Sequence, residues 1–241
     1  MKLKVLDKTA FTLAEVLITL GIIGVVAALT LPALIQNNRN KELQTGLKKA
    51  YSVISQALDM YQAETGERLK PDGSLTEHGQ LGTILQKYFN IIKICGYAYS
   101  SDNAADSRGC IPNDSTSRKE GSAYKTFNGS TFINLDKFDD SQFILNDGML
   151  LMIENQAQAT TDPLYISVDV NGYKKRPNRL GQDLFLFQID SKGKLLPMGV
   201  PNSDYYDAND AYCSASSSNN MNGAGCTYKA LIEKDFFQKM P

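Results

Sequence analysis

The feature that most constrains this chain is an apolar stretch near its N-terminus. Residues 11–38 contain one charged side chain, Glu15, and no charged side chain lies between Val16 and Ile35. Twenty helical residues rise about 30 Å, the thickness of the hydrocarbon core of a bilayer. The ten residues before the stretch contain three lysines and one aspartate. Positive charge directly before an apolar span predicts a cytoplasmic N-terminus and a body on the far side of the membrane.

The residues at the start of this stretch form a motif. A short basic leader ends in a small residue, Ala10, and the apolar run begins at Phe11 with Thr-Leu-Ala-Glu directly after it. This N-terminus resembles the class III leader of type IV prepilins and type II secretion pseudopilins. In that family a membrane-embedded prepilin peptidase cuts before the Phe and methylates the new amine, which implies cleavage between Ala10 and Phe11. The family most often has Gly before the cut, where this chain has Ala10.

The resemblance implies a role for Glu15 in filament assembly. An ionised carboxylate in hydrocarbon costs several kcal/mol, so an acid inside a membrane helix indicates function by default. Cleavage would create a partner, the free amine of Phe11 one helical turn away, and a neighbouring subunit could offer the same amine. Such a pair would neutralise charge and set axial register, a use known for buried polar groups in helical assemblies. The alternative is an acid that lies at the headgroup level or stays protonated.

The helix is expected to continue beyond the apolar stretch. Apolar residues recur at spacings of three and four from Leu43 to Tyr61, which predicts one buried helix face, and Gly66 is the expected stop. Pro32 is expected to kink the helix instead of ending it, because the apolar pattern resumes after it.

Three residues mark a weak segment inside this helix. Gly21, Gly24 and Pro32 each weaken local helical hydrogen bonding. In lipid the helix should stay continuous, because unpaired backbone groups are expensive there. Resemblance to type IV pilins implies that this segment bends, or loses helicity, when a filament assembles.

These features divide the chain into four parts. They are a leader at residues 1–10, a transmembrane or filament-core half of the helix at 11–38, a head-packed half at 39–65, and a globular α+β head at 66–241. The resemblance implies the type IV pilin-like fold, in which a long N-terminal helix packs on an antiparallel β-sheet. The head has the length of one domain.

The second half of the head has the pattern of β structure. Two apolar runs flank Asp147-Gly148, a strong hairpin signal. Strands are expected at residues 142–146, 149–153, 164–170, 183–189 and 194–196. Strands joined by short turns predict an antiparallel meander whose apolar face is covered by the long helix. Short helices are expected over residues 81–90 and 228–239.

The four cysteines lie in segments rich in Ser, Asn, Asp and Gly. Disulfides are favoured beyond a membrane, and proximity favours two local pairs, Cys95 with Cys110 and Cys213 with Cys226. We expect two polar loops, residues 96–130 and 202–227, that behave as independent surface flaps. The alternative is a zinc site built from four cysteines, although no CxxC occurs.

One loop of the head offers oxygen ligands. Asp169, Asn171 and Asp183 lie around a single loop between strands, and calcium prefers such ligands. Major pseudopilins carry calcium in a loop of the head, so the resemblance extends to calcium here. Tyr173 stands where an EF-type loop would place a further oxygen. The alternative is a structural turn at Asn171-Gly172 with Asp183 as a local cap. No other cofactor is expected.

Composition and motifs argue against other function classes. Without the leader the chain has 22 basic and 25 acidic residues, a net charge of −3, so broad binding to nucleic acid is not expected. No P-loop, nucleophile elbow or HExxH motif occurs, and the single histidine, His78, lies in a turn segment. We therefore do not expect an enzyme.

The function implied by the resemblance is that of a structural subunit, a pilin or pseudopilin, of a type IV pilus or type II secretion-like filament. The implied partners are copies of this chain and other pilins, the prepilin peptidase, an assembly platform membrane protein and the membrane. The protein would be a single-pass membrane protein with an extracytoplasmic head, and later part of a periplasmic or extracellular filament. The alternative is a membrane-anchored extracytoplasmic binding or adhesion domain that does not polymerise.

Overall fold

The computed structural model describes residues 12–96, 110–111, 123–135, 137–155, 164–206 and 208–241. The leader and the cleavage site expected between Ala10 and Phe11 lie outside these residues. The chain divides into two compact units, Met1–Lys41 and Glu42–Pro241. The second unit is the head.

A single helix, α1, runs from Leu13 to Thr65. Pro32 lies inside it, so the prediction that the helix continues past this proline is confirmed. The helix ends where the sequence indicated. Gly66 has a positive φ of 81° and its N–H donates to Gln62 O at 2.8 Å. A left-handed glycine directly after the last turn is a common helix stop.

Six strands form one antiparallel sheet in which spatial order follows sequence order. Their bounds are β1 Ile91–Gly96, β2 Ser141–Leu145, β3 Leu150–Glu154, β4 Leu164–Asp169, β5 Leu184–Ile189 and β6 Leu195–Pro197. The meander and the β2–β3 hairpin at Asp147-Gly148 were predicted correctly. The strand β1 was not. It is an edge strand whose Ile92 and Ile94 are exposed, so it lacks the in–out alternation that identifies a strand from sequence.

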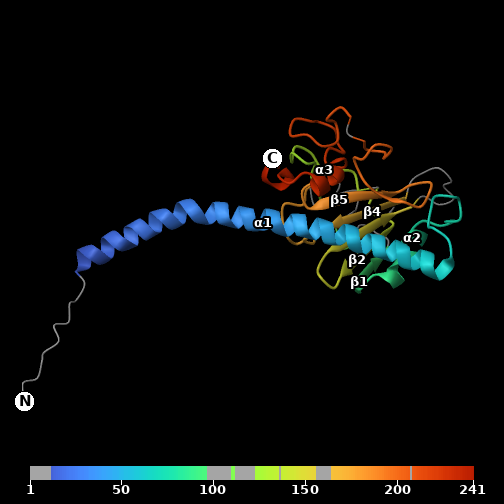
Figure 1. The fold of residues 1–241 in the computed structure, drawn as a ribbon, viewed down its shortest axis with the longest axis horizontal. Helices are drawn as coiled ribbons and strands as arrows, with labels where there is room; N and C mark the ends of the chain where they lie inside the picture. The colour runs from blue at the N-terminus through green and yellow to red at the C-terminus, as the bar shows by residue number, and fades with distance from the viewer. Residues whose placement is uncertain (1–11, 97–109, 112–122, 136, 156–163, 207) are drawn as a thin grey trace, which may run out of the picture. The chain divides into compact units, whose positions relative to one another are not determined.

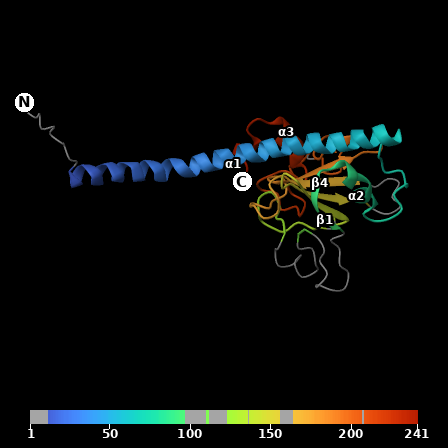
Figure 2. The same cartoon turned by 90° about the horizontal axis from the view of Figure 1, so that it is seen from below.

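The part of α1 that belongs to the head packs on one face of the sheet (Figures 1 and 2). Five apolar residues spaced three or four apart are buried there: Leu43, Leu47, Ala50, Ile54 and Ala57. The ring of Tyr51 stacks on Phe187 of β5 with centroids 5.9 Å apart. At Gly46 an added Cβ would lie 3.0 Å from Val170 Cβ, so this glycine allows the helix to approach closely. The predicted α+β architecture is confirmed.

The opposite face of the sheet is also buried, although only the face under the helix was expected to be covered. A second apolar cluster joins sheet residues such as Met152 and Leu186 to Tyr124 and Met221 from the polar loops and to Phe138, which lies shortly before β2. The signal was present, because a continuous apolar run such as residues 149–153 indicates a strand with both faces covered.

The two polar loops contact one another, so the expectation that they are independent flaps is wrong. The Phe127 N–H donates to Asn222 O at 2.8 Å, and Asn128 Nδ2 donates to Ser217 O at 2.9 Å. Loops that carry buried aromatic side chains form part of the core, and their hydrogen bonds satisfy the backbone groups that are buried with them.

Short helices complete the head. The helix expected over 81–90 is present as α2, Gln80–Leu85, followed by a 3₁₀ turn η1, Gln86–Tyr88. The final helix begins earlier than expected and is divided into α3, Cys226–Ile232, and η2, Phe236–Gln238. The hydroxyl of Thr227 in α3 accepts the Leu186 N–H at 3.1 Å, which attaches α3 to β5.

Candidate functional site

The first part of α1 presents an apolar surface on all sides. From Leu13 to Ile35 its large hydrophobic side chains are exposed, from 41% at Val16 to 77% at Leu13. Among the described residues, α1 is the one helix that is long and apolar enough to cross a membrane. A continuous apolar surface of this length indicates contact with lipid or with other protein.

The hydroxyl groups inside the apolar segment are satisfied by the helix itself. Thr19 Oγ1 donates to Glu15 O at 2.9 Å, and Thr30 Oγ1 donates to Val26 O at 2.9 Å. An unpaired polar group in hydrocarbon costs several kcal/mol. These two threonines therefore enter an apolar medium without an unpaired donor.

Glu15 belongs to a capping box at the N-terminus of α1. Its Oε2 accepts the Thr12 N–H at 2.8 Å and the Thr12 hydroxyl at 2.9 Å, while Thr12 Oγ1 accepts the Glu15 N–H at 3.3 Å. The first N–H groups of a helix have no intrahelical partner, and this reciprocal pair satisfies two of them. Glu15 was identified from the sequence, whereas the capping role of Thr12 was missed. The spacing Thr-x-x-Glu was the signal for it.

The other expected roles in this segment stay predictions. The amine expected as the partner of Glu15 belongs to Phe11, which lies outside the described residues. Gly21 and Gly24 lie in open positions, where an added Cβ would meet nothing within 4 Å. The bending expected at Gly21, Gly24 and Pro32 belongs to the assembled filament, so it too stays a prediction.

In the head, Asp169 and Asp183 are fully buried and their carboxylates are occupied by donors of the protein. Asp169 accepts the Gly172 N–H at 2.9 Å and the Tyr124 hydroxyl at 2.6 Å. Asp183 accepts the N–H of Asn178 and of Arg179, each at 2.7 Å. These bonds match the alternative in which the two acids hold a turn.

The same loop keeps two features of a cation site. Burial, and next the negative charge of Asp183, raise the pKa of Asp169 to about 7. The side-chain oxygens Asn171 Oδ1 and Asn178 Oδ1 are buried and have no hydrogen-bond partner within the described part of the chain. Calcium at Asp169, Asn171 and Asp183 stays a prediction.

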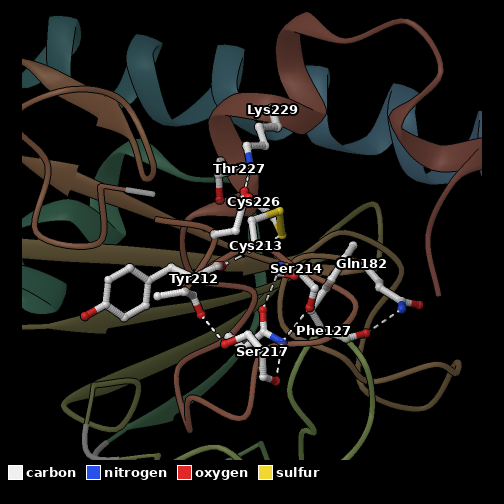
Figure 3. The surroundings of a disulfide bond; sticks show 12 residues. Phe127, Gln182, Tyr212, Cys213, Ser214, Ser217, Cys226, Thr227 and Lys229 are labelled. Atoms are coloured by element: carbon white, nitrogen blue, oxygen red, sulfur yellow. Dashed lines mark hydrogen bonds and ion pairs between the residues drawn. A yellow bond between two sulfur atoms is a disulfide. The ribbon is translucent and has the colours of Figure 1, made fainter. Parts of the chain in front are cut away.

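The cysteines pair locally, Cys95 with Cys110 and Cys213 with Cys226. This is the pairing that proximity favoured, and it excludes a zinc site made of four thiolates. Figure 3 shows the second disulfide beside Tyr212 and Thr227. The Gly223 N–H donates to Tyr212 O at 2.7 Å, which bridges the two arms of the loop that this disulfide closes.

The geometry defines a class of protein: an antiparallel α+β head on a helix that is long and apolar enough for a single membrane span. No protein-family model, curated protein or solved structure matches the chain. The narrower resemblance to prepilins therefore depends on the N-terminal motif and on the helix-and-sheet architecture.

Proposed function

We propose that the chain is a structural subunit, a pilin or pseudopilin, of a type IV pilus or type II secretion-like filament. The observation that carries this proposal is one acid, Glu15, in the first turn of an apolar helix that is otherwise uncharged as far as Ile35. A helix that served only as an anchor would have no need of a carboxylate in the membrane.

The capping box supports a direct role for that carboxylate. Processing between Ala10 and Phe11 would leave an amine on Phe11. Covalent geometry places this amine about 3 to 3.6 Å from the backbone nitrogen of Thr12. Glu15 Oε2 lies 2.8 Å from the Thr12 nitrogen. We expect the carboxylate to pair with this new N-terminus before assembly, and an equivalent amine of a neighbouring subunit would replace it in a filament.

The head supplies further support. Two disulfides fit an extracytoplasmic compartment, where such bonds persist. Before assembly the protein would reside in the membrane and interact with the prepilin peptidase and an assembly platform protein. Afterwards its apolar helix would pack among copies of itself and other pilins.

Two variants at one position separate charge from capping. Glu15→Ala removes the charge and the cap, whereas Glu15→Gln removes the charge and keeps a side chain that can complete a capping box. We expect both variants to insert normally and to reduce filament yield about tenfold or more, because an amine loses its buried partner. The measurements are membrane fractionation and quantification of sheared filaments. Normal yield from Glu15→Gln would show that only the cap matters and would overturn the charge-pairing argument.

Processing is tested separately by the mass of the protein from its native membrane. Loss of residues 1–10 with the addition of one methyl group is expected. An unprocessed protein that forms no filaments would favour the alternative function, a membrane-anchored binding domain that does not polymerise.

A further inference from the structure

Three buried acids meet at the open end of the β2–β3 hairpin. Asp139 and Asp140 directly precede β2, and Glu154 is the last residue of β3. Carboxylate oxygens of the three lie within 4.8 Å of one another, and each residue is at most 7% exposed. Like charges this close in a buried place need a counter-charge or a proton.

Donors of the protein satisfy only part of this cluster. Asp140 Oδ2 accepts the Asn155 N–H at 2.8 Å, and Asp140 Oδ1 lies 3.6 Å from Nδ1 of the half-exposed His78. The ammonium of Lys137 acts on Glu154 and lies over the ring of Tyr165, 5.6 Å from the centroid.

Glu154 Oε2 provides the second observation. This atom is buried and has no hydrogen-bond partner among the residues that the structure describes. A buried polar atom is almost always paired, so an unpaired oxygen on a carboxylate of this cluster indicates a missing ligand. The arrangement differs from that of Asp169 and Asp183, whose oxygens accept hydrogen bonds from the protein.

We propose that Asp139, Asp140 and Glu154 bind one divalent cation of the calcium type. Two ligands of a calcium ion lie 2.3–2.6 Å from it and so at most about 5 Å from each other, and carboxylate oxygens are the ligands it prefers. The spacing within this cluster meets that limit. This cation site does not depend on the function proposed above.

The site is distinct from the loop at Asp169. In the β3–β4 ladder Glu154 pairs with Tyr165, whereas Asp169 pairs with Leu150, so the two acids lie at opposite ends of these strands. Four residues of strand separate the two ends by about 13 Å. One ion cannot serve both.

An ion at the cluster would connect the sheet to the turn before α2. Asn155, which holds Asp140, also donates to Glu77 O at 2.9 Å and accepts the Leu81 N–H at 3.0 Å. The ion would thereby stabilise the head.

Calcium-dependent unfolding of the full chain in detergent micelles tests the proposal. The probe is 5 mM calcium chloride against EDTA, with near-ultraviolet circular dichroism as the readout. A dissociation constant in the range of extracellular modules predicts that calcium raises the Tm of the wild type by about 3 to 6 °C. Glu154→Gln should lose this rise, and the matched control Glu67→Gln, at an exposed glutamate, should keep it.

Equilibrium dialysis with radioactive calcium gives a second readout that does not depend on Tm. Glu154→Gln and Asp139→Asn should each bind one ion fewer than the wild type. Absence of a Tm rise in the wild type would mean that a proton relieves the repulsion, and the proposal would fail. An equal rise and equal stoichiometry in Glu154→Gln would place the ion elsewhere and would overturn it too.

Discussion

The head contains several acidic side chains that are buried, which is unusual for charged residues. Asp169 and Asp183 are stabilised by backbone N–H groups of their own loop, an arrangement that local sequence can specify. Asp140 and Glu154 come together only through the hairpin. Because like charges are buried close together there, the charge state of these two acids depends on pH and on ions.

Glu154 should make the calcium-free protein less stable as pH rises. Burial, and then the charges of Asp140 and Asp139, raise the pKa of Glu154 to about 9 from 4.5. Between these values the folded state keeps a proton that the unfolded state releases, so stability present below pH 4.5 is lost progressively toward pH 9. In EDTA, Glu154→Gln should therefore be more stable than the wild type by about 1 to 3 kcal/mol at pH 8 and nearly equal to it at pH 5.

Urea unfolding at the two pH values measures this difference. The facing charged groups, Asp139, Asp140, His78 and Lys137, are unchanged in the variant, so their own titration appears in both proteins. A destabilised Glu154→Gln at pH 8 would mean that the carboxylate is ionised and paired in the folded state.

The acidic cluster could have been predicted from the sequence, although it is absent from the expectations above. A hairpin centred on Asp147-Gly148 pairs Ser141 with Ile153, and the same register carried one step outward sets Asp140 opposite Glu154. The contact with His78 was not predictable, because it depends on how the turn before α2 packs against the sheet. Glu15 was identified since an acid in an apolar run is rare, whereas its capping partner required attention to local spacing.

Of the two loops that disulfides close, the C-terminal loop between Cys213 and Cys226 is expected to contribute more to stability. Cys226 is fully buried, and the loop supplies Met221 and Ala224 to the second apolar cluster. A loop of this size is stabilised by its disulfide by about 3 kcal/mol. Replacing both cysteines with Ala should lower the Tm by about 6 to 12 °C in a thermal scan.

The other disulfide serves as the comparison. Cys95 and Cys110 are 15 residues apart, against 13 for the C-terminal pair, so their loop-closure entropies are nearly equal. A larger decrease in Tm when the C-terminal pair is replaced would show that the packing of its loop also contributes to stability. An equal decrease in Tm for both variants would mean that each disulfide stabilises the head only by lowering the entropy of the unfolded chain.

The sequence predicted the helices and strands better than it predicted which segments pack on the two faces of the sheet. Hairpin turns, strand alternation and helix periodicity are local signals, and they were enough to predict the strands β2 to β6. The edge strand β1 is recognised only by its pairing with β2. The apolar run of β3 signals that the second sheet face is covered, but it does not say by which segments. These are set by contacts between loops about 90 residues apart, such as that of Phe127 with Asn222, which no local pattern encodes.

For the complete chain, the division into two units predicts a head that folds without the apolar segment. All residues of both apolar clusters lie at or after Leu43, within the unit Glu42–Pro241. Deletion of residues 1–41 should therefore yield a water-soluble protein whose Tm lies within a few degrees of that of the full chain in detergent. Circular dichroism and gel filtration check this. Aggregation, or loss of the near-ultraviolet signal, would show that the first unit is needed for folding of the head.

The agreement between strand order and sequence order has a consequence for how the head is made. Each strand pairs with the segment that precedes it, so a chain emerging N-terminus first can add strands one at a time to the face of α1. Contacts of this local kind favour rapid folding. The second sheet face is completely covered only when Met221 and Ala224 join the cluster. A chain interrupted before these residues would leave part of this apolar face exposed, and such surfaces are what chaperones and proteases recognise.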